Sequence, residues 1–423
     1  MVTVEIIVLS ALATALIMII GINFVTSEKR LARRPRRLYD IEDVDFTRAL
    51  GVLLGPSITS GNRIEALVNG VEIFPAMLEA IGDAEHTITF ETFIFWSDPI
   101  ANKFQDALCA ASRRGVRVHV HIDWVGSQNL GDGIIPALKD AGVEVEIYHP
   151  LSWYHLHRMN NRTHRKLMII DGWIGFTGGV GIAEIWTGNA EDEDHWRDTH
   201  YRVEGPVVAQ MQAAFLDNWM KTTGRVLHGD RYFPDLEPAG HSRAQMFASS
   251  PQQGAESMQL MVAIALGAAS REIWIQNAYF VPDALTTSAL IAASRRGVAV
   301  RIMVPGGKTD AHIVRHASQA QWGKLLAAGV EIYEYQRTMM HCKVMVIDQV
   351  WTSIGSANFD TRSFRVNDEA NLNVWDGEFA RVQLALIEND LCECRAYNYE
   401  RWRRRPLWRR SLERAASLLR SQL

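Results

Sequence analysis

The chain has 423 residues, of which 48% are hydrophobic and 22% are charged. These ordinary globular values exclude a disordered chain, a collagen-like chain and a protein with many membrane spans, and the length suggests two or three domains or one duplicated unit. The formal net charge of −4 is uneven, because residues 28–37 sum to +5 and residues 395–423 to +7, which leaves −16 for the remainder. An acidic body with two basic ends argues against a nucleic-acid channel and predicts local contact with an anionic surface.

The first predicted element is a membrane anchor. Residues 4–25 (VEIIVLSALATALIMIIGINFV) are apolar apart from four polar side chains, and about 20 such residues are enough to cross a bilayer. A signal peptide would open with basic residues and have a shorter apolar core; a buried core helix is the alternative. The basic residues within 29–37 favour an anchor whose C-terminal side faces the cytoplasm. We therefore predict a single-pass anchor in the cell membrane over 1–27, a polybasic linker over 28–45 and a cytoplasmic catalytic body.

The body of the chain is an internal duplication. Three segments occur twice in the same order: ASRRGVRVHV (111–120) and ASRRGVAVRI (293–302), AGVEVEIY (141–148) and AGVEIYEY (328–335), HRKLMIIDG (164–172) and HCKVMVIDQ (341–349). Such self-similarity indicates two copies of one folding unit. We predict one half over 46–240 and a second over 241–423, which includes a basic C-terminal tail.

Each copy alternates helices with apolar strands. An Ala-rich helical run ends at Arg-Arg-Gly and a β-branched strand follows; a second helix ends at Ala-Gly before another strand and the His segment. The predicted strands are Thr87–Phe95, Val116–Ile122, Val143–Tyr148 and Lys166–Asp171, with counterparts Glu272–Phe280, Val298–Val304, Val330–Tyr335 and Lys343–Asp348. This alternation indicates an α/β fold with a mixed sheet flanked by helices in each half.

The repeated His segment carries the chemistry. Both copies read H-x-K-x4-D, with the residues His164, Lys166, Asp171 and His341, Lys343, Asp348. On a strand, residues i and i+2 share a face, so the His and Lys of each copy point the same way, and each Asp falls at the strand end. Small residues follow both copies, Gly178-Gly179-Val180-Gly181 and Gly355-Ser356-Ala357-Asn358, where backbone donors can approach an anion closely. One such motif would be weak evidence, but two in the same register indicate a functional site.

These motifs resemble those of the phospholipase D superfamily, and the chain looks most like its bacterial cardiolipin synthase branch. The resemblance covers about residues 46–423. It extends to the segments at 61–81, 90–98, 196–208, 275–283 and 355–372. It implies that the two halves pack with both motifs in one active site, and that phosphodiester transfer proceeds through a phosphohistidine.

The residue types fit this reaction. A phosphodiester needs an attacking group, a proton donor for the leaving alkoxide and positive charge around the phosphoryl oxygens. By family order His164 is expected to be the nucleophile and His341 the acid/base, although the residues alone are symmetric. Lys166 and Lys343 supply point charges, so no metal and no cofactor are expected. The catalytic set is His164, Lys166, Asp171, His341, Lys343 and Asp348.

A supporting set surrounds these residues. The resemblance implies that an acidic residue holds the second ring nitrogen of each His: Glu369 is the candidate in the second half and Asp198 in the first. Ser356 and Asn358 are expected to donate further hydrogen bonds. Gly181 stands where the second copy has Asn358, which predicts an asymmetric site with a backbone donor in the first half.

Other features have structural interpretations beside functional ones. Tyr279 could line an acyl entrance, but an aromatic residue at a strand end is more often core, and the same holds for Trp96, Trp173 and Trp186. His155 and His157 are expected to be loop residues. Cys342 lies between a His and a Lys, so it should point into the core. The tail at 401–419 mixes Trp, Leu and Arg, which favours a membrane interface over a solvated helix.

The leading hypothesis is a membrane-anchored phosphatidyltransferase that makes cardiolipin from two phosphatidylglycerol molecules and releases glycerol. The first alternative is a phospholipase D, in which water accepts the phosphatidyl group. A nuclease or phosphodiesterase of the same superfamily would have a basic body, which this chain lacks. A non-catalytic scaffold would have lost His or Lys from one motif.

Overall fold

The computed structural model describes residues 5–6, 9–14, 17–18, 39–150, 160–250 and 256–418. The first-half strands are β1 (Thr59–Val68), β2 (Thr87–Thr92), β3 (Arg117–Asp123), β4 (Glu144–Tyr148), β5 (Leu167–Ile170), β6 (Ile174–Gly178) and β7 (Thr199–Glu204). The second-half strands are β8 (Ser242–Ser249), β9 (Glu272–Asn277), β10 (Ala299–Pro305), β11 (Glu331–Tyr335), β12 (Lys343–Ile347), β13 (Trp351–Gly355), β14 (Glu369–Trp375) and β15 (Cys394–Tyr397).

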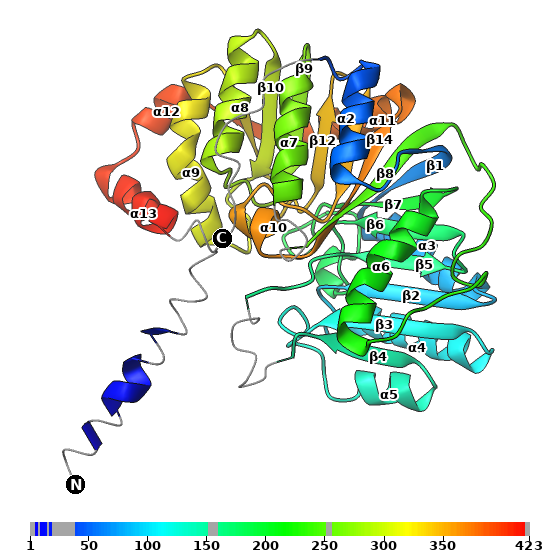
Figure 1. Cartoon of the computed structure of the whole chain (residues 1–423). Coiled ribbons are helices and arrows are strands. Elements are labelled where there is room, and N and C mark those ends of the chain that lie inside the picture. The colour runs from blue at the N-terminus through cyan, green and yellow to red at the C-terminus, as the bar shows by residue number, and fades with distance from the viewer. Residues whose placement is uncertain are drawn as a thin grey trace.

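In the described residues these strands form one sheet in the order β15-β11-β10-β9-β12-β13-β14-β8-β1-β7-β6-β5-β2-β3-β4. Read outward from the β1–β8 junction, both halves have the same order, and the second half adds β15 at its edge (Figure 1). The outer strands β2-β3-β4 and β9-β10-β11 are parallel, and the inner ones are antiparallel. The predicted α/β fold with two repeated mixed-sheet halves is confirmed.

Two strands end earlier than predicted. β2 stops at Thr92 and β9 at Asn277, although the apolar runs continue to Phe95 and Phe280. There the chain leaves the ladder, and single bridges join Phe95 to Ile182 and Phe280 to Phe359. The apolar character beyond the strand ends therefore reflects packing at the carboxyl edge of the sheet, close to the small-residue turns.

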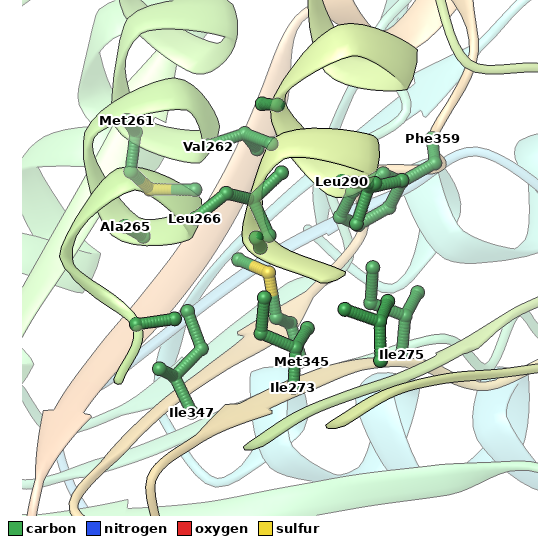
Figure 2. Close-up of a cluster of buried hydrophobic side chains, with 14 of the residues drawn as sticks. Met261, Val262, Ala265, Leu266, Ile273, Ile275, Leu290, Met345, Ile347 and Phe359 are labelled. Atoms are coloured by element: carbon green, nitrogen blue, oxygen red, sulfur yellow. The ribbon is translucent and has the colours of Figure 1, made fainter. Parts of the chain in front are cut away.

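Helices cover both faces of each half. The first half carries α3 (Asn69–Asp83), α4 (Pro99–Arg113), α5 (Ile134–Asp140), the short 3-10 helix η2 (Glu184–Trp186) and α6 (Val208–Thr223). The second carries α7 (Glu256–Ala268), α8 (Ala284–Arg295), α9 (His312–Leu326), α10 (Thr361–Arg365) and α11 (Gly377–Leu391). Figure 2 shows the core of the second half, where Leu266 and Leu290 lie over Ile273 and Met345. α3, α4 and α5 bury the corresponding core of the first half, and the side chains beneath α6 and α11 form one cluster shared by both halves.

The repeated Arg-Arg-Gly segments end helices in both halves. Gly115 and Gly297 adopt φ values of 97° and 93°, which L-residues with a Cβ rarely adopt, so the chain turns there into β3 and β10. The Arg before each Gly reaches back to the preceding helix: Arg114 donates to the carbonyl of Gly82 at 2.8 Å and Arg296 to that of Ala269 at 3.1 Å. These guanidinium groups satisfy carbonyls that a helix end leaves without partners.

The segment before β1 packs on the second half. α2 (Val44–Leu54) buries Phe46 and Leu50 in the second-half core, where the Phe46 ring lies edge-on to Trp351. The first half was predicted to begin at residue 46, but the residues of α2 after that point pack on the second half. The chain joins the first-half sheet only at β1. The predicted start of the second half at residue 241 lies next to Ser242, the first residue of β8.

Two helices follow β15 and pack on α9: α12 (Tyr399–Arg403) and α13 (Leu407–Leu418) (Figure 1). α13 turns a charged residue inward, because the buried Glu413 carboxylate pairs with Arg405 Nη1 at 2.7 Å. Its outer surface exposes large apolar side chains beside polar ones, with Leu407, Trp408 and Leu418 exposed to 76%, 69% and 83%. The tail is thus folded onto the body, and Arg405 is held inside.

No helix in the described part of the chain is long and apolar enough to span a membrane. The predicted anchor over 1–27 and the polybasic residues 29–37 lie largely outside the described residues.

Candidate active site

Short backbone bridges between the halves bring the two His motifs together. The His164 amide donates to the Asp368 carbonyl at 2.8 Å, and the His341 amide donates to the Arg197 carbonyl at 2.7 Å. Reciprocal bonds run from Asp368 to the Arg162 carbonyl and from Arg197 to the Met339 carbonyl. Each His segment is therefore joined, just before its strand, to the residue that precedes the acid of the opposite half.

The acid partners are consequently crossed between the halves. His164 Nδ1 lies 3.0 Å from Glu369 Oε2, and His341 Nδ1 lies 2.9 Å from Asp198 Oδ2. All four side chains are buried, with the two carboxylates fully so. Since an ionised carboxylate only accepts hydrogen bonds, Nδ1 of each ring is the donor and Nε2 is left for chemistry. The structure thus places Glu369 and Asp198 on the rings but pairs each acid with the His of the other half.

The two acids are supported by different donors. Ser356 Oγ donates to the Glu369 carboxylate. At the position equivalent to Ser356 stands Gly179, where a Cβ would lie 2.3 Å from Asp198 Oδ1. Trp186 Nε1 donates to Asp198 Oδ2 at 3.1 Å instead, and the Thr199 amide donates to Oδ1 at 2.8 Å. Asp198 has a shorter side chain than Glu369, so its carboxylate lies against the turn. Only glycine leaves room for it at position 179.

Both lysines lie beside their own motif's His. Lys343 Nζ is 3.1 Å from His341 Nε2, and Lys166 Nζ donates to the His164 carbonyl at 2.8 Å. Burial, together with the charge of Lys343, lowers the pKa of Lys166 to about 7. Burial likewise lowers the pKa of Lys343. Two ammonium groups taken out of water so close together would be stabilised by a bound anion.

Burial also keeps both imidazoles neutral. It lowers the pKa of His164 to about 4 and, with the added effect of Lys343, that of His341 to about 3, against the opposing effect of the carboxylates. Burial pushes the pKa of Asp198 and Glu369 upward, but their His and Lys neighbours outweigh it and hold both below the ordinary values. At neutral pH the site therefore holds two neutral imidazoles and two carboxylates.

Aromatic rings surround the His pair unequally. The Phe93 ring lies 5.2 Å from the His164 ring, with Lys166 Nζ over it. Around His341 lie Trp186, Trp196 and Tyr279, at 5.4, 5.3 and 6.0 Å between ring centres. Trp186 was expected in the core and is buried, but it also contacts His341.

Sequence reasoning missed Trp196 and Phe93 as site residues. The signal available was position: Trp196 stands two residues before Asp198, and Phe93 directly follows β2. Trp96 is half-buried, and Trp173 is 44% exposed, so Trp173 lies outside the core in which it was expected.

The motif aspartates lie at the other end of their strands. Asp171 accepts the amides of Glu85, His86 and Thr87 at 2.8, 2.7 and 2.6 Å. Asp348 accepts the corresponding amides before β9, among them that of Arg271 at 2.8 Å. The structure does not bring either carboxylate to the His–Lys pairs; both fix the turn that leads into the neighbouring strand.

Asn358 is buried, and its backbone N–H donates to Ser363 Oγ at 3.0 Å. A Cβ at Gly181, its first-half counterpart, would lie 2.8 Å from Ile94 Cβ, so no side chain fits there. The asymmetry predicted at this position therefore has a steric cause. Cys342 is buried in the core shared by both halves, as predicted, and His155 and His157 lie outside the described residues.

In the part of the chain that the structure describes, no three His, Cys, Asp or Glu side chains gather as metal ligands would. The chemical resources of the site are the paired His–carboxylate units, two lysines, and the amides of the small-residue turns. This set can hold a phosphoryl group, attack it and move one proton.

A duplicated α/β sheet with two His–Lys motifs meeting across the halves defines the phospholipase D class of proteins. Comparison with known proteins gives the family: the model of the cardiolipin synthase, PLD-like domain family matches residues 77–219 and 262–391. The chain belongs to this family.

Curated relatives agree with this assignment. The chain is 35% identical over 365 residues to a cardiolipin synthase of Alkalihalophilus pseudofirmus, covering 86% of this chain and 72% of the relative. It is 34% identical to the major cardiolipin synthase ClsA of Bacillus subtilis, covering 85% of this chain and 75% of that one.

Among solved structures, a phosphatidylserine synthase of Haemophilus influenzae superposes with a TM-score of 0.68 over 89% of this chain and 100% of that one, at 13% identity. A polyphosphate kinase of Porphyromonas gingivalis superposes with a TM-score of 0.53 over 80% of this chain and 49% of that one, at 12% identity. At these identities the two structures support the fold alone.

Proposed function

We propose that this protein is a cardiolipin synthase that transfers a phosphatidyl group from one phosphatidylglycerol to a headgroup hydroxyl of another. The observation that carries the proposal is the crossed pair of His–carboxylate units beside two lysines. Because Nδ1 of each ring is held by a carboxylate, the Nε2 atom of each ring is the one that can act on a phosphoryl group, and that of His341 lies beside Lys343 Nζ. The relatives named above are cardiolipin synthases, which supports cardiolipin as the product.

The first half-reaction forms a phosphohistidine. His164 Nε2 attacks phosphorus, the bond from phosphorus to the glycerol oxygen breaks, and glycerol leaves with a proton from His341 Nε2. Burial and Lys343 hold the pKa of His341 at about 3 in the free enzyme. A phosphodiester anion bound at the lysines offsets that positive charge, so substrate binding favours the protonated ring.

The second half-reaction returns the enzyme to its starting state. Neutral His341 removes a proton from a headgroup hydroxyl of a second phosphatidylglycerol, and that oxygen attacks phosphorus as the bond to His164 breaks. The products are cardiolipin and glycerol. The aspartates 171 and 348, which belong to the predicted catalytic set, support the strands in this scheme and do not touch the phosphoryl group.

The test is incubation of the purified full-length protein with labelled phosphatidylglycerol as its single lipid. Cardiolipin and glycerol in equal amounts are expected. Phosphatidic acid and glycerol without cardiolipin would instead identify a phospholipase D that uses water.

We further propose that the chain is a single-pass protein of the cell membrane, anchored through residues 4–25, with the catalytic body on the cytoplasmic side. The acidic body with basic ends and the exposed Leu and Trp side chains of α13 support contact with anionic lipid. Of the basic tail residues, Arg403, Arg404 and Arg414 are exposed, whereas Arg405 is paired with Glu413 and buried.

Vesicle binding tests this contact. Leu407→Ser combined with Trp408→Ser should reduce binding and turnover on vesicles rich in phosphatidylglycerol, and leave turnover in detergent micelles unchanged. Val382→Ser on α11 replaces an apolar side chain that is 46% exposed elsewhere on the surface and is the control. Equal losses in vesicles and micelles would contradict docking through α13.

A further inference from the structure

The two sides of the active site are lined differently, although the fold repeats. The segments 90–98 and 275–283 are equivalent, since they begin with the last residues of β2 and β9 and Phe95 and Phe280 make equivalent bridges. In this alignment Ile94 occupies the position of Tyr279. An apolar residue thus stands in the first half where the second half has a hydroxyl.

The Tyr279 hydroxyl is held by a carboxylate from another loop. It donates to Asp310 Oδ2 at 2.6 Å. Asp310 lies between β10 and α9, at the carboxyl edge of the parallel strands, where α/β sheets commonly bind ligands. Asp310 is exposed and Tyr279 half-buried, so the carboxylate of the pair is open to solvent while the tyrosine ring reaches His341.

Asp310 is also close to the reacting groups. Burial lowers the pKa of Lys343, and the charge of Asp310 is among those that oppose this effect. The Tyr279–Asp310 pair therefore lies beside the proton-transferring side of the site, within electrostatic reach of the lysine that would contact the phosphoryl group.

We propose that Tyr279 and Asp310 form the subsite for the alcohol, binding the hydroxyl groups of the glycerol that leaves and of the glycerol headgroup that enters. This inference rests on the proposed function. His341 exchanges its proton with that alcohol, so the alcohol must lie on the His341 side. Asp310 accepts a hydrogen bond from the glycerol hydroxyl that does not react, and the Tyr279 oxygen, whose proton is given to Asp310, accepts another.

Such a subsite distinguishes a polyol from water. Both acceptors can reach the phosphohistidine, but only a polyol has a second hydroxyl to engage the carboxylate while the first one reacts. Hydrogen bonds to charged groups are stronger than those between neutral groups, so the loss of this one should weaken alcohol binding at least on the order of tenfold.

The experiment runs the reaction in reverse, with cardiolipin in detergent micelles and free glycerol. Attack of His164 on cardiolipin expels one phosphatidylglycerol and leaves a phosphatidyl enzyme, which isotope-labelled glycerol converts to labelled phosphatidylglycerol and water converts to phosphatidic acid. Because the labelled phosphatidylglycerol and the phosphatidic acid arise from one intermediate, their ratio reports the competition between the two acceptors. In Asp310→Asn the glycerol concentration that gives equal capture by glycerol and water should rise about tenfold, and Tyr279→Phe should shift it in the same direction.

The control is Asp132→Asn, an exposed aspartate in the corresponding loop between β3 and α5; it should leave the ratio unchanged. If Asp310→Asn lowers both products equally, Asp310 is structural and the inference is overturned. A wild-type enzyme that cleaves cardiolipin only with water would overturn the proposed synthase function as well, which distinguishes the two failures.

Discussion

Gly179→Ala should disable the enzyme through a single carboxylate. A Cβ at this position would lie 2.3 Å from Asp198 Oδ1 and 2.5 Å from Oδ2. The φ angle of Gly179 is not in the left-handed region, so alanine adds no backbone strain and the clash is the whole perturbation. Relief to an ordinary carbon–oxygen contact of about 3.3 Å requires the carboxylate to move by about 1 Å.

That movement breaks the 2.9 Å contact between Asp198 and His341 Nδ1. A misplacement of about 1 Å in a catalytic group costs on the order of 10²-fold in rate. We therefore expect kcat for cardiolipin formation to fall about 100-fold, measured with labelled phosphatidylglycerol in micelles. The equivalent Ser356→Ala removes a donor to Glu369 without a clash and should cost less.

Two further variants test the reasoning. Gly82→Ala, at the end of α3, has no atom near the added Cβ and should leave kcat unchanged. Asp198→Asn should reduce kcat strongly, and adding Gly179→Ala to it should cost little more, because both changes act on one contact. Near wild-type turnover of Gly179→Ala, with the protein folded, would refute the role given to Asp198.

Four other outcomes are expected. His164→Ala and His341→Ala should each abolish turnover, and only the former should fail to trap a phosphoenzyme, as seen by acid-quenched labelling; a single active variant would contradict the shared site. Turnover should survive excess EDTA, since lysines and amides supply the charge stabilisation, and rescue of an inactive stripped enzyme by one metal would count against this. Asp171→Ala and Asp348→Ala should each lower the free energy of unfolding by about 1–3 kcal/mol through uncapped amides, while the folded fraction keeps its kcat, as thermal denaturation and active-site titration would show. Burial lowers the pKa of His164 and His200 to about 4, so the unfolded chain takes up these protons at a higher pH than the folded protein does. The free energy of unfolding should therefore be constant above pH 6.5 and decrease as pH falls from 6.5 to 4. Urea unfolding across this range would measure the decrease, and a flat profile would refute the prediction.

Much of the site followed from the sequence because its pattern is local. His164 and Lys166 are two residues apart, and the repeat in the second half reproduces that spacing, so strand geometry alone orients each pair. The turn at Gly178 and Gly355 was visible for the same reason. Asp198 and Glu369 were each predicted to hold a His ring. Nothing in the chain order indicates, however, that Glu369 holds His164, which lies 205 residues away.

The aspartates of the motifs show the opposite limit. Asp171 and Asp348 occur at the same distance from the His and Lys in both motifs, and this repetition suggested a catalytic role. In each motif a strand, β5 or β12, separates the aspartate from the His and Lys. The carboxylate therefore lies at the other end of the strand, over the amides that begin β2 or β9. A residue that is repeated in both halves can therefore serve local structure, such as a turn, as well as catalysis.

The duplicated α/β fold and the residue types of the proposed reaction could be predicted from the sequence, because both depend on spacing along a strand. The tertiary structure decided which acid serves which His, why Gly179 and Ser356 differ, and that α13 turns Glu413 inward and Trp408 outward. These features arise where segments distant in the chain meet, and the packing of one half against the other fixes distances that no local pattern encodes. The contact of the Tyr279 ring with His341 likewise appears only in the folded chain.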